Sequence, residues 1–90
     1  EGGMRLLHIV AADTQAVRLV RQDLARGIDF SVVATRYSVG PTAARGGDLG
    51  WVMPDEMVEP LRSAIRKLKA GEVSQATESR GTWHFFKRLP

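Results

Sequence analysis

The chain has 90 residues, of which 43% are hydrophobic and 26% are charged, which predicts one small globular domain rather than a disordered or membrane-spanning segment. It contains no cysteine, which excludes thiol chemistry and disulfide bonds, and its two histidines lie too far apart in the sequence for a zinc motif. The net charge of +3 comes from lysines and arginines scattered along the chain, a pattern that favours solvated surface charge over nucleic-acid binding.

The first half of the chain predicts one strand followed by two helices. Residues 4–11 form a largely apolar run that is typical of a central strand. Asp13 can cap a helix over residues 14–26, in which apolar residues recur at helical spacing. Asp29 can cap a second, shorter helix over residues 30–38, which again carries one apolar face.

The second half predicts a loop, a short strand, a long helix and a hairpin. Residues 39–50 hold four glycines and one proline, which indicates a loop, and a short strand is expected at residues 49–52. A third helix is predicted over residues 60–71, because proline is tolerated at its first position and glycine at its end. Residues 73–78 and 83–89 are predicted to be two strands joined by a tight turn.

This order of elements favours an antiparallel α+β sheet with helices packed around it over a doubly wound parallel sheet, because its last two strands form a hairpin. No apolar run approaches the roughly 18–20 residues that a bilayer requires, so no membrane span is expected. No repeat or low-complexity tract is present. The residues alone therefore predict a soluble α+β domain and no specific function.

Five segments, spread over residues 5–88, carry the functional information. The central one is Gly46-Gly47-Asp48-Leu49-Gly50-Trp51, followed by Met57 and Pro60. The other four are Leu7-His8-Ile9-Val10, Gly27-Ile28-Asp29-Phe30-Ser31, Gly71-Glu72-Val73-Ser74 and Trp83-His84-Phe85-Phe86-Lys87. In this order and at this spacing they resemble the parvulin family of peptidyl-prolyl cis/trans isomerases. The conjunction is specific, although each segment alone is a weak signal.

The resemblance implies a parvulin-like fold of the FKBP-like superfold, with a four-stranded antiparallel sheet, surrounding helices and the order β-α-α-(α)-β-α-β-β. It implies one isomerase domain over residues 4–90. The composition of residues 1–3, Glu-Gly-Gly, is typical of a linker or a remnant of cloning. Some family members use an insertion between the first strand and the first helix to bind phosphate. That insertion is missing here, so phosphoserine-proline specificity is not expected.

The resemblance places two histidines on the floor of the site. His8 and His84 match the paired histidines of the family, which face each other across adjacent central strands. Taken singly, each is more commonly a core histidine, but two neutral imidazoles can hydrogen-bond to each other without burying a charge. Ser79 matches a hydroxyl position that supports the pair, and its alternative role is a turn serine that bonds to its own backbone.

Other positions of the site differ from the family pattern. Met57 and Leu61 match the two apolar positions of the proline pocket, the second of which is usually phenylalanine. Trp51 is expected near the rim of the groove. Gly40, or Val39 if the loop is counted backwards from the glycines, stands where the family places an aspartate or cysteine among the catalytic residues. We expect the loss of this acid or thiol to lower the rate more than the affinity.

The resemblance implies an isomerase that assists protein folding by binding X–Pro segments in an apolar groove, without a metal or cofactor. Its partners are expected to be proline-containing segments of unfolded or partly folded proteins, and the domain to be monomeric in isolation or part of a larger chaperone. The alternative is a catalytically weak parvulin domain that serves as a peptide-binding module of a chaperone. The resemblance favours a location in the bacterial periplasm or envelope, and a cytoplasmic location is the alternative.

Overall fold

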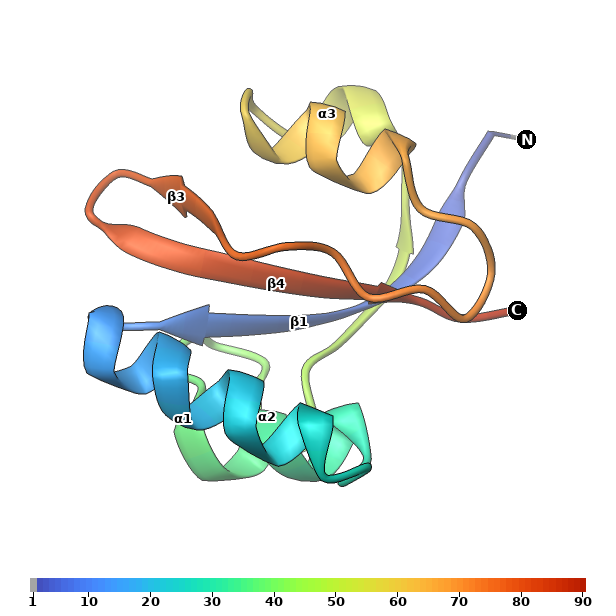
Figure 1. The fold of residues 1–90 in the computed structure, drawn as a ribbon. Coiled ribbons are helices and arrows are strands. Elements are labelled where there is room, and N and C mark those ends of the chain that lie inside the picture. Colours follow the sequence, from blue (N-terminus) through green and yellow to red (C-terminus); the bar gives the residue numbers. More distant parts are fainter. Residues whose placement is uncertain (1) are drawn as a thin grey trace.

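A four-stranded antiparallel sheet with the strand order β2-β1-β4-β3 organises the computed structural model, which describes residues 2–90. The two central strands, β1 and β4, are the first and the last strand of the chain (Figure 1). The predicted α+β class and the four-stranded antiparallel sheet are thereby confirmed. The strands are Met4–Ala11 for β1, Asp48–Val52 for β2, Thr77–Ser79 for β3 and Thr82–Arg88 for β4.

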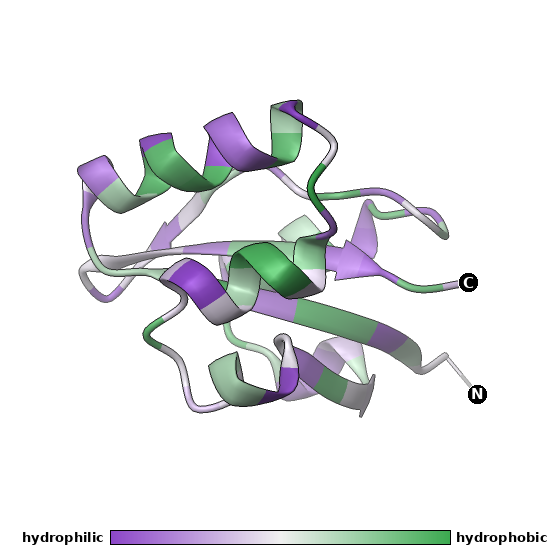
Figure 2. Ribbon diagram, turned by 90° about the horizontal axis from the view of Figure 1, so that it is seen from below, coloured by the Kyte–Doolittle hydropathy of each residue, from purple (hydrophilic) through white to green (hydrophobic). Residues whose placement is uncertain are grey.

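Helices cover both faces of the sheet. α1 (Thr14–Ala25) and α2 (Phe30–Tyr37) lie against one face, and α3 (Leu61–Arg66) lies against the other (Figure 1). Two short 3₁₀ turns, Ala43–Arg45 and Pro54–Glu56, precede β2 and α3. Figure 2 shows α1 in alternating hydrophilic and hydrophobic bands, as expected of a helix with one buried face. Within residues 2–90 no helix has the length and apolar content needed to cross a bilayer.

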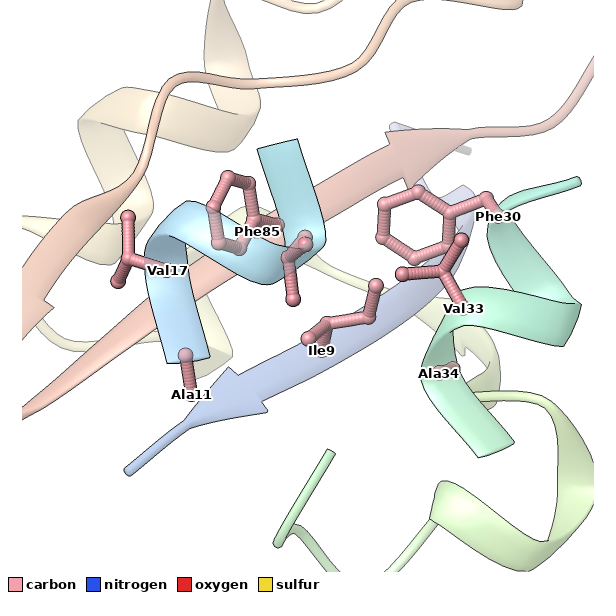
Figure 3. Packing of buried hydrophobic residues seen from close by; sticks show 8 residues of the cluster. Ile9, Ala11, Val17, Phe30, Val33, Ala34 and Phe85 are labelled. Atoms are coloured by element: carbon pink, nitrogen blue, oxygen red, sulfur yellow. The ribbon is translucent and has the colours of Figure 1, made fainter. Parts of the chain in front are cut away.

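The sheet separates two hydrophobic cores, because successive residues of a strand point to opposite faces. On the α1 and α2 side, the core includes Ile9 and Phe85, which are register partners on β1 and β4 (Figure 3). On the α3 side, the core includes Leu6 and Phe86. The two outer layers of helices are therefore held by different residues of the same two strands.

Capping and packing contribute differently to the first two helices. The carboxylate of Asp13 accepts a hydrogen bond from the Ala16 N–H at 2.9 Å, as predicted for the N-cap of α1. Asp29 stands at the N-cap position of α2, but its side chain makes no capping hydrogen bond. Phe30 and Val33 are buried in the core, so packing rather than side-chain capping holds α2.

The third helix is shorter than the sequence predicts. The prediction extends over residues 60–71, whereas α3 ends at Arg66. The chain beyond the helix bonds to β4 instead: the Arg88 side chain donates to the Leu68 carbonyl at 2.9 Å, and the Gly71 N–H donates to the Arg88 carbonyl at 2.7 Å. Because these residues bond to β4, the chain after Arg66 leaves the helical path and α3 ends there.

The strand predicted at residues 73–78 is also shorter, because β3 is preceded only by an isolated bridge between Val73 and Lys87. The Ser74 hydroxyl accepts a hydrogen bond from the Phe86 N–H at 2.9 Å. This side-chain bond replaces a backbone ladder bond, so regular pairing is interrupted there. The predicted hairpin between β3 and β4 is confirmed.

Gly47, directly before β2, lies against the backbone of His8. Its carbonyl accepts a hydrogen bond from the His8 N–H at 2.8 Å, and its φ of 83° lies in the left-handed region. A Cβ added to Gly47 would lie only 2.3 Å from the His8 carbonyl oxygen. Glycine at this position therefore permits the close contact with the His8 backbone that holds His8 next to the start of β2.

We expect Gly47→Ala to lower the free energy of unfolding by about 2 kcal/mol more than Gly27→Ala does. The two glycines have φ values of 83° and 82°, so the backbone strain of an alanine is similar at both. Gly27 has no atom within 4 Å of an added Cβ, whereas Gly47 has the His8 backbone. Urea denaturation measures the difference, and equal destabilisation would contradict the role given to this contact.

Candidate functional site

His8 on β1 and His84 on β4 lie side by side on the α3 face of the sheet. His8 Nε2 is 2.8 Å from His84 Nδ1, so the two imidazoles are hydrogen-bonded. In the register of the strands, His8 lies opposite Phe86 and His84 lies opposite Val10, which makes the histidines diagonal neighbours. The predicted pairing of the two histidines on neighbouring central strands is confirmed.

Aromatic stacking fixes the orientation of this pair. The His8 ring is nearly parallel to the Phe86 ring, with 4.5 Å between the ring centroids and 2° between the planes. The two imidazole centroids are 5.1 Å apart, with 14° between the ring planes. Because Phe86 is fully buried in the α3-side core, the histidines rest on an apolar base that is itself immobilised by packing.

A chain of hydrogen bonds continues from His84 to the end of β3. The Thr82 hydroxyl lies 3.0 Å from His84 Nε2 and 3.3 Å from the Ser79 carbonyl oxygen. A carbonyl can only accept, so Thr82 donates its one proton to Ser79 and accepts from His84 Nε2–H. This pattern assigns His84 Nδ1 as the acceptor and His8 Nε2–H as the donor within the pair.

The hydroxyl that supports the pair therefore belongs to Thr82 and not to Ser79, which corrects the prediction. Within residues 2–90, Ser79 contributes to this chain of bonds through its main-chain carbonyl. Side chains two residues apart on a strand point to the same face. The predicted strand begins at residue 83, whereas β4 begins at Thr82, and this one-residue difference left Thr82 out of the predicted site.

Both histidines are neutral at pH 7. Burial, together with the neighbouring His84, lowers the pKa of His8 to about 4. Burial also lowers the pKa of His84, although the Ser79 carbonyl and the Glu78 carboxylate act in the opposite direction. A neutral pair can lie among apolar side chains without a counterion.

Leu61 and Met57 pack against the core that contains Phe86. Leu61 is 8% exposed and belongs to this core, while Met57 is partly buried against it. The Arg62 Nε–H donates to the Met57 carbonyl at 3.0 Å, which ties Met57 to the first turn of α3. The two predicted apolar positions thus share the α3 side of the sheet with the histidines, and Leu61 is also a core residue.

Trp51 points away from this side. Trp51 lies on the edge strand β2 and pairs with Arg5 of β1. Its neighbour Val52 is buried in the α3-side core. Since side chains alternate along a strand, the indole of Trp51 points to the opposite face, where the residue is 73% exposed. The structure therefore does not bring Trp51 to the rim of the groove, which corrects the prediction.

Gly40 lies beside the histidine face, but the space next to it is filled. The Ser38 hydroxyl accepts hydrogen bonds from the N–H groups of Val10 and Gly40, at 2.9 and 3.2 Å, and so holds the loop against β1. A Cβ added to Gly40 would lie 2.8 Å from Cγ2 of Val10, the residue opposite His84 in the register. Val10 therefore occupies the space that a side chain at residue 40 would need.

The arrangement offers an apolar surface next to two neutral, hydrogen-bonding rings. Within residues 2–90, no group of three or more His, Cys, Asp and Glu side chains is placed to hold a metal ion. The Thr82 hydroxyl is engaged on both sides, by His84 and by the Ser79 carbonyl. Such a surface can bind an apolar ring and surround a polar bond with groups of low polarity.

Comparisons with known proteins agree with this geometry. The family model described as "Rotamase: PPIC-type PPIASE domain" matches residues 8–89. The chain is 40% identical over 85 residues to the foldase protein PrsA of Geobacillus kaustophilus, and 48% identical over 60 residues to the chaperone SurA of Bordetella avium. These matches cover 93% and 67% of the chain but only 30% and 12% of the two relatives, so the chain spans less than a third of either protein.

Solved structures share the fold. The crystal structure of PrsA from Bacillus subtilis matches with a TM-score of 0.91 and 36% identity, over 99% of this chain and 35% of that one. The solution structure of NmPin, the parvulin of Nitrosopumilus maritimus, matches with a TM-score of 0.85 and 27% identity, over 100% of this chain and 98% of that one. The parvulin-like fold implied by the sequence is confirmed.

The histidine pair leads us to expect a loss of stability as the pH falls from 6.5 to about 4. In this window an unfolded His8 takes up a proton, whereas the folded His8, with its lowered pKa, stays neutral. Because the unfolded state then binds more protons, the free energy of unfolding decreases on acidification, by about 3 kcal/mol over the window. Urea denaturation at several pH values across the window measures this slope.

His8→Phe is the control for this measurement. Phenylalanine keeps a ring that can stack on Phe86 but cannot take up a proton, so the variant should lose less stability on acidification than the wild type. Carboxylates titrate in both proteins and contribute equally to the two slopes. Identical slopes would mean that His8 does not carry the pH dependence.

Proposed function

This chain belongs to the family of PpiC-type peptidyl-prolyl cis/trans isomerase domains, and we propose that it accelerates rotation about X–Pro bonds in segments of other polypeptides. The observation that carries the proposal is the neutral pair of His8 and His84, stacked on Phe86 on the side of the sheet that also holds Met57 and Leu61. The family match supports the reaction, and the geometry of the pair supports the choice of site.

Rotation about an X–Pro bond breaks no covalent bond. The barrier of about 18–20 kcal/mol arises from the partial double-bond character of the amide, which is lost when the bond is twisted. Twisting also reduces the charge separation between the amide nitrogen and oxygen, so water stabilises the planar form more than the twisted form. A surface that replaces water with apolar groups therefore favours the twisted state and requires no nucleophile.

We assign different roles to the two sets of side chains. Met57 and Leu61 bind the proline ring, and His8 and His84 form the floor over which the amide rotates. Thr82 orients the pair through its hydrogen bond to His84 Nε2. Leucine supplies a smaller wall than the phenylalanine usual in the family, so we expect proline to bind more weakly than it does to an aromatic pocket.

The loop at Gly40 favours a second candidate function, that of a catalytically weak domain that binds peptides for a chaperone. Gly40 presents no polar side chain to the histidine face, and Val10 fills the adjacent space. The two functions use the same apolar surface beside the histidines and differ in rate rather than in binding. We favour the isomerase because the histidine pair and the apolar positions are both in place.

The natural partners in this proposal are proline-containing segments of unfolded or partly folded proteins. Relatives named foldase and chaperone support partners of this class. Those relatives are more than three times as long as the matched region, so activities of a whole foldase or chaperone are not assigned to this domain. An extracytoplasmic location, such as the bacterial periplasm, is proposed from the resemblance alone.

We expect Met57→Ala to lower kcat/KM for a proline-containing peptide about tenfold, which corresponds to about 1.4 kcal/mol of lost transition-state binding. Met53→Ala is the matched control, because Met53 is 43% exposed and lies outside the proposed pocket. An NMR assay that follows cis-to-trans exchange of the peptide, without a coupling protease, measures both variants. Wild-type activity in Met57→Ala would contradict the placement of the pocket, and an inactive wild type would leave only the binding function.

Restoring an acid at residue 40 should raise the isomerisation rate only if Val10 is made smaller as well. In Gly40→Asp alone, the new Cβ meets Cγ2 of Val10, a branched side chain with few alternative rotamers, so we expect this variant to lose stability. Val10→Ala removes Cγ2 and gives the carboxylate room beside the histidines. The double variant and both single variants are compared in rate, peptide affinity and denaturation midpoint. A folded double variant that is no faster than Val10→Ala would show that this loop does not tune the rate.

A further inference from the structure

A hollow of about 470 Å³ lies between α1 and the strands at the end of the chain. We call it the α1 groove. In Figure 1, the start of α1 and the β3–β4 hairpin lie at the same end of the molecule. The α1 groove is lined by the first two turns of α1 and by residues at and before the last hairpin, namely Thr14, Val17, Arg18, Arg21, Ala76 and Trp83.

The α1 groove and the histidine site lie on opposite faces of the sheet. Trp83 and His84 follow each other on β4, so their side chains point in opposite directions. Trp83 packs against the core beneath α1 and α2, whereas His84 bonds to His8 on the α3 side. A ligand in the α1 groove therefore leaves the histidine face open.

Two arginines on the rim of the α1 groove lack an acidic partner. Arg18 and Arg21 lie one turn apart on α1, and both are exposed. Within residues 2–90, no carboxylate lies within 4.0 Å of either guanidinium group, while other arginines of the fold do form ion pairs, namely Arg5, Arg26, Arg36 and Arg66. Like charges one helical turn apart repel each other, so a bound anion would be stabilised between them.

The acidic side chains that flank the α1 groove are engaged with the backbone. Asp13 accepts the Ala16 N–H at 2.9 Å, and Glu78 accepts the Gly81 N–H at 2.9 Å. Neither carboxylate forms an ion pair with an arginine of the groove. The lining of the groove itself therefore carries two arginine charges and no carboxylate, over an apolar floor formed by Val17, Ala76 and Trp83.

The backbone beside the α1 groove suits an extended ligand. Ala76 lines the groove and directly precedes β3, which is an edge strand of the sheet. In the part of the chain that the structure describes, the outer side of β3 pairs with no other strand. An extended peptide can therefore use main-chain hydrogen bonds at this edge while its side chains reach the arginines.

We infer that the α1 groove binds an acidic, extended segment of a polypeptide. Arg18 and Arg21 bind its carboxylates, and Trp83 contacts its apolar atoms. The site is separate from the histidine face and needs no proline. Binding a polypeptide here would raise the effective concentration of its neighbouring X–Pro segments at the histidine face. The benefit of this for isomerisation rests on the proposed function.

The test uses the full chain with Trp51→Phe, so that Trp83 is the remaining one of its two tryptophans. The probe is a proline-free peptide of alternating Glu and Thr, and the comparison peptide carries Gln in place of Glu. We expect the Glu peptide to change the Trp83 fluorescence saturably, and to bind about tenfold more tightly than the Gln peptide. Higher salt should weaken this binding.

Arg18→Gln combined with Arg21→Gln should weaken binding of the Glu peptide about tenfold. The matched control combines Lys67→Gln with Lys69→Gln, which removes the same charge from exposed lysines beyond α3 and should leave the affinity unchanged. Three outcomes would overturn the inference. The arginine variant could bind the Glu peptide as tightly as the wild type, or the lysine variant could be weakened equally. A single-stranded oligonucleotide could also bind more tightly than the Glu peptide.

The two proposals fail separately. The Glu peptide contains no proline and is detected at Trp83, so its binding does not require a working isomerase site. Met57→Ala is therefore measured with the same Glu peptide and should bind it normally. If the chain binds the Glu peptide but does not isomerise X–Pro bonds, only the proposed function is contradicted. If it isomerises X–Pro bonds but does not bind the Glu peptide, only the inference about the α1 groove is contradicted.

Discussion

The pairing of β1 with β4 is the constraint on which the rest of this structure depends. It joins the first strand of the chain to the last, from the partners Leu6 and Arg88 to the partners Ala11 and Trp83. These two strands form the centre of the sheet and divide the interior into a core under α1 and α2 and a core under α3. A slip of one residue in either strand would turn its side chains to the other face and separate the two histidines.

The same pairing makes the histidine site part of the core. His8 stacks on Phe86 and donates a hydrogen bond to His84 Nδ1, and His84 Nε2–H in turn donates to the Thr82 hydroxyl. Removing one imidazole would leave a polar atom of the other without its partner, at a cost of about 1–3 kcal/mol. If the pair acts as proposed, a substitution in it changes both stability and activity, so its kinetic effect has to be read together with the folded fraction.

Elements whose ends depend on local contacts were predictable from the sequence, and those limited by distant contacts were not. The Asp13 cap and helical spacing predict α1 to within one residue of its end. α3 and β3 are shorter than predicted because Arg88 and Ser74 bond to distant main-chain groups. At the site, the family resemblance identifies the histidines. Trp51 was misplaced because its neighbour Val52 is also apolar, so hydrophobicity does not show which of them faces the core.

The antiparallel alignment of β1 and β4 also brings the two ends of the fold together. The Leu89 N–H donates to the Arg5 carbonyl at 2.9 Å, and the N- and C-terminal ends leave the sheet on the same side (Figure 1). A polypeptide that enters this fold at β1 therefore emerges next to its point of entry. Such a unit can be accommodated within a surface loop of a host protein without forcing the flanking segments apart, and it needs no long tether to either of them.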